Sequence, residues 1–145
     1  MIGPFLKTAE LSRFCATAGL LLDQGLSLPE TLRLCSEVVK DETLKNAARR
    51  SLREVMEGFP LSQSLRRSGL AEPYLLTVLG VGEAQGDLAL AFRRASARYQ
   101  REVDRQVKIF GALIEPVLIL AVGLFVASVV FSVMLPVFDL NFAIN

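Results

Sequence analysis

The sequence predicts an all-α protein: a six-helix bundle whose last helix continues into a single C-terminal transmembrane helix. Three observations predict this class. Apolar residues recur at the three-and-four spacing of helices throughout residues 1–108, glycines and prolines separate the helical segments, and residues 116–138 contain no Asp, Glu, Lys or Arg. No segment shows the alternation of apolar and polar residues that is typical of a strand.

The uncharged segment explains an unusual composition. The 145 residues are 52% hydrophobic and have a mean hydropathy of +0.42, which is high for one soluble domain. As a helix, residues 116–138 would extend about 34 Å, compared with about 30 Å for the hydrocarbon core of a bilayer. The segment is C-terminal, unlike a cleavable signal peptide, and it is apolar on all faces, unlike most buried helices of small domains.

The charge distribution predicts the orientation. All 16 Lys and Arg residues lie at or before Lys108, and Asp139 is the one charged residue after Phe138. Basic residues stay on the cytoplasmic side, so we expect residues 1–108 to be cytoplasmic, 109–138 to span the membrane and 139–145 to form a short periplasmic tail. The cytoplasmic part carries a net charge of about +3, which is too low to indicate nucleic-acid binding and is compatible with a nearby lipid bilayer.

The first two predicted helices meet at Gly25. The first buries the helical series from Leu11 to Leu22 and ends at Gly25, and Ser27 with Glu30 then forms a capping box for the second. Cys15 and Cys35 are equally distant from Gly25, so a hairpin there would bring them close together. The chain has no histidine to complete a zinc site, so a zinc site is not expected. We expect both to be reduced packing residues in a reducing cytoplasm, and a structural disulfide is the alternative.

Four further helices follow. The third runs from about Asp41 to Gly58, and its outer side is expected to be solvated and free of binding sites; that side carries Lys45, Arg49, Arg50 and Glu54. Pro60 and Pro73 open the fourth and fifth helices. Asp87 caps the sixth, in which no glycine or proline occurs before Gly111, so this helix is expected to continue directly into the membrane.

Two local patterns are candidate structural or interaction sites. In the first, Gly86 permits a left-handed turn, Gly82 permits close backbone approach, and Glu83 could bind backbone donors of the next helix or a partner. In the second, Glu115 and Pro116 lie at the start of the apolar segment, where a carboxylate is costly unless it is paired, solvated or enclosed by protein. A Glu115 that only meets water or Lys108 at headgroup level is the alternative.

Catalytic residues are not recognisable. The sequence lacks a phosphate-binding glycine loop, a histidine base and a nucleophile elbow. We expect no enzymatic activity, no cofactor and no metal, and any ATP hydrolysis must come from another protein.

The ordered patterns resemble the type II secretion system protein F family, which includes the platform proteins of type IV pili. The resemblance rests on five segments: Phe14 with residues 20–28, residues 58–65, residues 81–88, Glu115-Pro116, and Leu135-Pro136-Val137-Phe138. It covers nearly the whole chain but only the C-terminal half of typical members, which have two cytoplasmic domains and three membrane helices.

The resemblance implies a non-enzymatic, oligomeric platform in the bacterial inner membrane. It implies as partners a cytoplasmic assembly ATPase, other inner-membrane secretion or pilus subunits, and pilin-like subunits. The residues at Phe138-Asp139-Leu140-Asn141 favour secretion slightly over pili. A membrane-tethered adaptor or a transporter subunit is an alternative, although Ser128 and Ser132 are the only polar side chains between Pro116 and Phe138.

Overall fold

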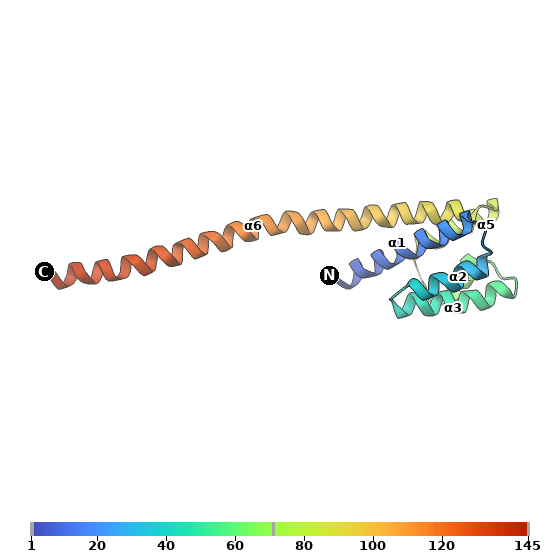
Figure 1. The fold of residues 1–145 in the computed structure, drawn as a ribbon, viewed down its shortest axis with the longest axis horizontal. Coiled ribbons are helices and arrows are strands. Elements are labelled where there is room, and N and C mark those ends of the chain that lie inside the picture. Colours follow the sequence, from blue (N-terminus) through green and yellow to red (C-terminus); the bar gives the residue numbers. More distant parts are fainter. Residues whose placement is uncertain (1, 71, 145) are drawn as a thin grey trace. The chain divides into compact units, whose positions relative to one another are not determined.

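The computed structural model describes residues 2–70 and 72–144, and these residues form six α-helices joined by short loops (Figure 1). The chain divides into two compact units, Met1–Asp104 (unit 1) and Arg105–Asn145 (unit 2). The helices are α1 (Ile2–Asp23), α2 (Leu28–Val38), α3 (Glu42–Met56), α4 (Leu61–Arg67), α5 (Pro73–Gln85) and α6 (Leu88–Ile144). The predicted fold class is therefore confirmed.

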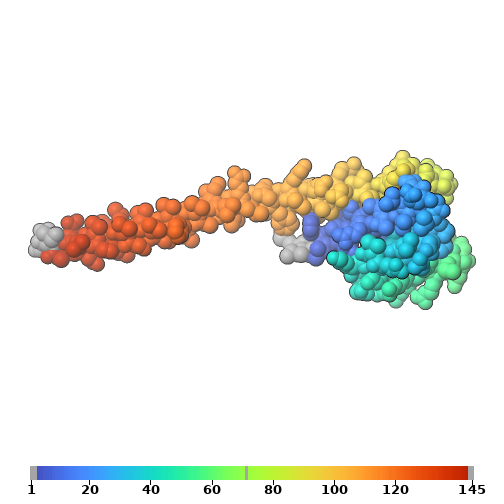
Figure 2. All heavy atoms as spheres, viewed as in Figure 1, coloured from blue at the N-terminus to red at the C-terminus, as the bar shows by residue number. Residues whose placement is uncertain are grey.

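Within unit 1, each helix from α1 to α5 packs on the next. Figure 2 shows α1 and α2, in blue and cyan, side by side on one face of this unit. The first part of α6 returns antiparallel to α1. The carboxylate of Asp23 accepts a hydrogen bond from Arg93 at 2.8 Å, whereas Ser12 donates to Gln100 at 3.3 Å.

The core of unit 1 joins the first and last helices to the others. Phe14 of α1 meets Phe92 of α6 edge to face, with ring centroids 6.2 Å apart, and both rings are fully buried. Tyr74 of α5 meets Tyr99 of α6 in the same manner at 6.0 Å. Burying a side chain of this size contributes about 1.5–3 kcal/mol, so these aromatic pairs anchor the bundle.

The helix ends follow the sequence signals closely. Asp41 accepts the backbone N–H of Leu44 at 2.8 Å and Asp87 accepts that of Leu90 at 3.0 Å, as expected for N-caps. Ser27 also accepts from the backbone of Glu30. The reciprocal half of the predicted capping box is absent, because the Glu30 carboxylate binds the guanidinium of Arg33 instead.

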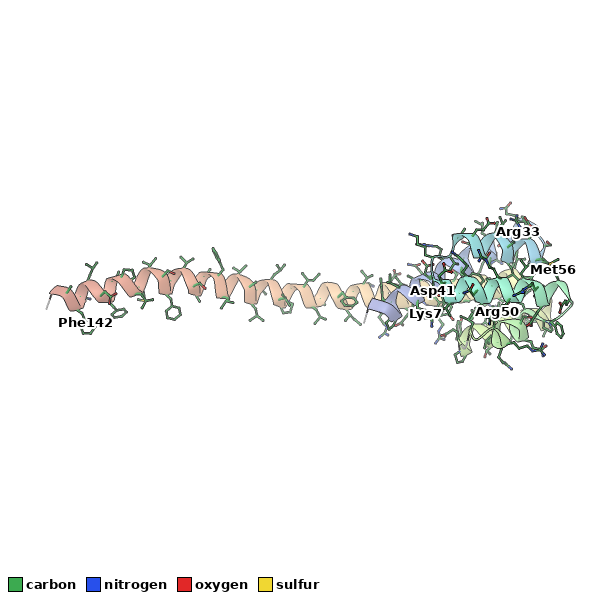
Figure 3. All side chains as sticks on the ribbon, turned by 90° about the horizontal axis from the view of Figure 1, so that it is seen from below. Lys7, Arg33, Asp41, Arg50, Met56 and Phe142 are labelled. Carbon is green, nitrogen blue, oxygen red and sulfur yellow. The ribbon has the colours of Figure 1, made fainter. Side chains whose placement is uncertain are left out.

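Unit 2 is the apolar continuation of α6. The window of highest hydropathy within α6 averages 2.8, and none of that window is buried in the structure. Figure 3 shows carbon side chains, including Phe142, projecting on all sides of this helix. A helix that is apolar all round has no solvent-facing side, and its length and composition suit a membrane span.

Candidate functional site

The α5–α6 turn is built as the sequence predicts. Gly86 has a φ of 71° in the left-handed region, where a side chain would be strained. The N–H of Asp87 donates to the carbonyl of Gly82 at 2.9 Å, and the N–H of Gly86 donates to that of Glu83 at 3.2 Å. This is the hydrogen-bond pattern of a Schellman motif, which satisfies the last carbonyls of α5.

Gly82 has a separate role in packing. A Cβ added at this position would lie 2.5 Å from the Cβ of Ala91 and 3.1 Å from the carbonyl oxygen of Asp87. Carbon atoms in van der Waals contact lie about 3.5–4.0 Å apart, so no larger residue fits without moving the helices. Gly82 thus allows α5 and α6 to cross closely.

Glu83 binds a different element from the one suggested by its place in the sequence. Its carboxylate accepts the backbone N–H of Ser62 at 2.8 Å and the hydroxyl of Ser62 at 2.6 Å. Ser62 lies in the first turn of α4, where Pro60 occupies the N-cap position and makes no side-chain cap. Glu83 therefore caps α4 from a distance, while Asp87 caps α6, the next helix.

Gly25 ends the first hairpin as predicted. Its φ is 88°, and the flanking Leu26 N–H donates to the carbonyl of Leu21 at 3.2 Å. The reversal brings Cys35 against α1, where its sulfur lies 4.0 Å from the carbonyl oxygen of Phe14. Both cysteines are buried and free, which agrees with the expected reduced packing residues.

Burial perturbs the ionisable groups near this hairpin. It raises the pKa of the Cys35 thiol to about 12. Burial, together with the neighbouring Cys35, raises the pKa of Cys15 further. Burial and then the charge of Glu72 raise the pKa of Tyr99 well above its ordinary value. All three groups stay neutral at physiological pH, so they are packing groups and not nucleophiles.

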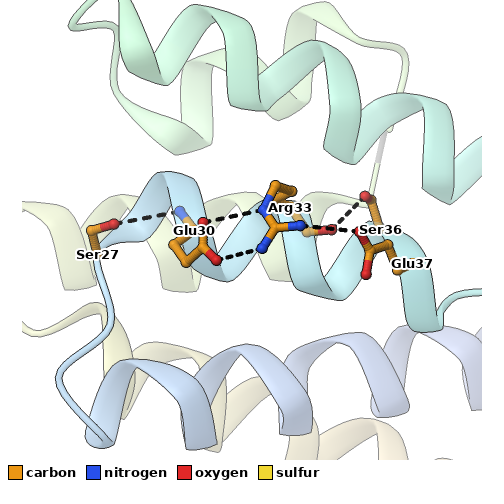
Figure 4. Close-up of polar contacts among 5 residues, drawn as sticks. All are labelled: Ser27, Glu30, Arg33, Ser36 and Glu37. Carbon is orange, nitrogen blue, oxygen red and sulfur yellow. Dashed lines mark hydrogen bonds and ion pairs between the residues drawn. The ribbon is translucent and has the colours of Figure 1, made fainter.

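The outer face of α2 carries an exposed ion-pair series, drawn in Figure 4. Arg33 donates to Glu30 at 3.1 Å and to Glu37 at 3.2 Å. The hydrogen bond from Arg33 lowers the pKa of the Glu30 carboxyl below its ordinary value. These groups satisfy one another in solvent, which is typical of a stabilised helix surface and indicates no site.

Three further candidates belong to unit 2. Glu115, Pro116 and Pro136 all lie within α6, and all three are exposed in this unit. Two of them are prolines inside a helix, where the missing N–H leaves a carbonyl of the preceding turn without its usual donor. Glu115, Pro116 and Pro136 are remote in sequence from the α5–α6 turn. The turn and the apolar segment are therefore separate candidate sites.

Sequence reasoning missed one arrangement in unit 1. A hollow between α3 and α4 is lined by Arg50, Arg53, Glu54, Glu57, Arg67 and Ser68, and we call it the arginine hollow. The α3 side chains alone had indicated a solvated helix face. Arg67 comes from the next helix, so only the packing of α4 on α3 brings the three arginines together.

The described residues contain no group of three or more His, Cys, Asp or Glu side chains placed to hold a metal ion. The geometry found in unit 1 consists of helix caps, a close helix crossing and a charged surface hollow. The caps and the close crossing position the helices of unit 1 relative to one another.

Comparison with known proteins identifies the family. The model of the family "Type II secretion system (T2SS), protein F" matches residues 14–136. The chain is 26% identical to type II secretion system protein F of Pseudomonas aeruginosa over 97% of its own length and 35% of the relative. It is 26% identical to type IV pilus assembly protein PilC of Myxococcus xanthus over 100% of its length and 35% of the relative.

A third relative, PilC of Thermus thermophilus, is 28% identical over 92% of this chain and 33% of its own length. The chain thus spans about a third of the length of these relatives. The family match covers most of this chain, including the α5–α6 turn and most of the apolar segment. The chain therefore belongs to the type II secretion system protein F family, whose members include inner-membrane proteins of type II secretion and of type IV pilus assembly.

Proposed function

We propose that this chain acts as a non-enzymatic inner-membrane platform of a type II secretion system, coupling a cytoplasmic assembly ATPase to pseudopilus assembly. The observation that carries the proposal is the family match over residues 14–136, which includes both the helical bundle and most of the apolar segment. The helices of the bundle are capped at their ends and packed on one another, so the bundle offers a defined contact surface. The apolar segment of α6 supplies a membrane anchor.

The proposal assigns each part a location. Residues 1–108 face the cytoplasm, 109–138 cross the inner membrane and 139–145 lie in the periplasm, because all the Lys and Arg residues precede the apolar segment. A cysteine placed at Asn141 should react with a membrane-impermeant maleimide from outside the inner membrane, and one placed at Arg49 should not. Labelling of position 49 in intact spheroplasts would refute this orientation.

The proposed partners are the assembly ATPase, other inner-membrane subunits, pilin-like subunits and further copies of this chain. Crosslinking in intact membranes followed by affinity purification tests them directly. We expect an assembly ATPase among the crosslinked proteins. Recovery of a soluble signalling protein in place of any assembly ATPase would favour a membrane-tethered adaptor instead.

Type IV pilus assembly is the second candidate function. The relatives from Pseudomonas aeruginosa and Myxococcus xanthus belong to the two systems and are equally similar to this chain, at 26% identity each. The residues at 138–141 favour secretion only slightly. The class of ATPase recovered by crosslinking separates the two: a secretion ATPase supports the first assignment, and a pilus ATPase supports the second.

Glu115 is the residue that we propose to matter most at the membrane. A carboxylate at the start of the span is stabilised by water, by a basic group or by a protein interior. Replacement by Ala or Leu in a cell that depends on the protein should impair secretion or piliation at equal protein level. Unchanged assembly would exclude a necessary role for this carboxylate, and Glu115→Gln separates its charge from its size.

A transporter subunit is less compatible with the helix. Of the two serines in the apolar segment, Ser128 donates its hydroxyl to the carbonyl of Leu124 at 2.9 Å, so this donor is used within its own helix. A wet pathway needs polar groups that face it. We expect no ion flux through vesicles that contain the protein.

A further inference from the structure

The arginine hollow is lined by three arginines and two glutamates, and two further arginines lie on the same two helices. The lining arginines are Arg50, Arg53 and Arg67, whereas Arg49 and Arg66 lie outside the lining. All five arginines are exposed. Over residues 49–68 the five arginines outnumber the two glutamates, so this part of unit 1 is more positively charged than the full chain, whose net charge is +1.

The arginines here differ from three others in unit 1, which have close ion pairs. Among the described residues, Arg13, Arg33 and Arg93 each form an ion pair at 3.2 Å or less. Arg67 approaches Glu54 only at 4.0 Å and otherwise lies over the Phe59 ring, 5.0 Å from its centroid. For Arg50 and Arg53 the described part of the chain provides no ion pair. Their guanidinium groups remain available to an external carboxylate.

Two exposed apolar side chains lie near these arginines in the chain, outside the lining of the hollow. Met56 is 71% exposed and follows Arg53 by three residues, and Figure 3 shows Met56 and Arg50 on the same helix. Phe59, held beneath Arg67, is 40% exposed. Guanidinium groups beside exposed Met and Phe side chains match a ligand with both carboxylates and apolar side chains. This combination favours an acidic protein segment over a free anion.

The position of the hollow along unit 1 also favours a protein. The α3 helix starts just after Lys40, whose N–H donates to Glu10 near the beginning of α1 at 2.8 Å. The helices α1, α2 and α3 alternate in direction (Figure 1), so α3 runs parallel to α1. Because α1 and the start of α6 are antiparallel, α3 runs away from the end of unit 1 at Asp104. Arg53 lies roughly 16 Å along α3 from its first residue. A lipid headgroup is expected instead near Arg105 and Lys108, which adjoin the apolar segment in sequence.

We propose that the arginine hollow is a docking site for an acidic amphipathic segment of a cytoplasmic protein. Carboxylates of that segment pair with Arg50 and Arg53, and an apolar side chain rests on Met56 and Phe59. The inference depends on the proposed function in one respect, namely that unit 1 faces the cytoplasm. It adds the surface and the chemistry of the partner that this surface selects.

The test uses the full chain in phosphatidylcholine nanodiscs and a fluorescein-labelled helical peptide that carries Glu and Leu on one face. We expect fluorescence anisotropy to show binding that weakens with salt, and binding at least about tenfold weaker for a peptide with Gln in place of Glu. The Arg50→Gln/Arg53→Gln variant should lose about fivefold to tenfold in affinity. Met56→Ser should lose about threefold, because it removes the apolar contact.

The matched control is Arg13→Gln/Arg33→Gln, which removes two exposed arginines from α1 and α2. It should change the affinity by less than about twofold. Equal binding of the Glu and Gln peptides, or equal loss in both double variants, would overturn the proposal. Tyrosine fluorescence of each variant confirms that unit 1 remains folded.

Other occupants give different results. Displacement of the peptide by phosphatidylglycerol vesicles would identify a lipid site, and a smaller detergent-solubilised assembly in Arg50→Gln/Arg53→Gln would identify a contact between copies; either result overturns the proposal. Failure of the proposed function is separate, since it appears in the labelling and crosslinking experiments. A crosslinked assembly ATPase together with no peptide binding would reject only the docking site.

Discussion

The bundle of unit 1 and the apolar helix of unit 2 are specified in different ways. In unit 1, named pairs such as Phe14 with Phe92 and Glu83 with Ser62 determine how the helices meet. In unit 2, nearly every side chain of a single helix is exposed, and none determines a position relative to another element of that unit. The bundle therefore depends on complementary contacts between helices, whereas the apolar helix depends on its amino-acid composition.

The largest expected effect is in the core of the bundle. Phe92→Ala should lower the free energy of unfolding of unit 1 by about 3–5 kcal/mol, because a fully buried ring is replaced by a cavity. Both tyrosines lie in unit 1 and the chain has no tryptophan, so tyrosine fluorescence during urea titration reports this unit alone. Leu20→Ala, at an exposed position, should change the value by less than about 0.5 kcal/mol. Equal effects of the two changes would contradict the described core.

The same substitution in both units tests the comparison most directly. Val122→Arg should make membrane insertion less favourable by about 2.5–3.5 kcal/mol, because it places a charge within the span. The measurement is the inserted fraction in a microsomal translocation assay. Val38→Arg, at an exposed position of α2, should leave insertion unchanged and alter unfolding of unit 1 by less than about 0.5 kcal/mol. If Val38→Arg lowered the inserted fraction, membrane insertion would depend on unit 1 as well as on unit 2, and the contrast between the two units would be wrong.

Two glycines provide a second matched pair. Gly82→Ala should destabilise unit 1 by about 1–3 kcal/mol, since the new Cβ would overlap Ala91. Gly123→Ala should cause no loss of helix stability, because a Cβ added at this position would meet nothing within 4 Å. Urea titration measures the first effect, and circular dichroism in detergent measures the second. Retained stability in Gly82→Ala would show that the α5–α6 crossing tolerates widening.

High pH should destabilise unit 1 through its buried thiols. Burial raises the pKa of Cys35 to about 12, so the folded chain keeps this proton while the unfolded chain releases it above about pH 8.5. The folded state then binds more protons, and the free energy of unfolding falls by about 1.4 kcal/mol per pH unit for each such thiol. Urea titrations between pH 8 and 11 measure this slope. The decrease in the free energy of unfolding per pH unit should be smaller in Cys35→Ala. An unchanged decrease would refute the raised pKa of Cys35.

The smallest effect concerns the remote cap on α4. A double-mutant cycle of Glu83→Ala and Ser62→Ala should give a coupling energy of about 1 kcal/mol, because the Ser62 hydroxyl donates to the Glu83 carboxylate and Ser62→Ala removes that hydroxyl while keeping the backbone N–H. The free energies come from urea titration followed by tyrosine fluorescence. Additive effects of the two changes would indicate that the hydrogen bond from the Ser62 hydroxyl contributes nothing to stability.

Local signals made most of the fold predictable. Ser27 and Asp87 cap helices at the positions expected from the sequence, and Gly25 and Gly86 adopt the left-handed turns expected of them. Such features depend on neighbours a few residues away, which a single sequence displays. The apolar periodicity also identified the buried positions from Leu11 to Ala18.

Contacts between distant segments were not predictable. Glu83 reaches Ser62 across 21 residues, and no local pattern selects that serine over the nearer backbone donors. Likewise, the sequence of α3 alone indicates that Arg50 and Glu54 lie on a solvated helix face. The packing of α4 brings Arg67 into the same hollow, and α3 alone does not predict this. In both cases the missing information was the packing of one helix on another.

The return of α6 onto α1 has a consequence for the timing of synthesis. Ser12 finds its partner Gln100 only after 88 further residues have been made, so the bundle cannot close around Phe14 early in translation. At about 5–20 residues per second, the N-terminal helix waits roughly 4–18 seconds for the first turns of α6, which complete its packing. The closing turns of α6 and its apolar segment therefore leave the ribosome in immediate succession, because they are adjacent in one helix.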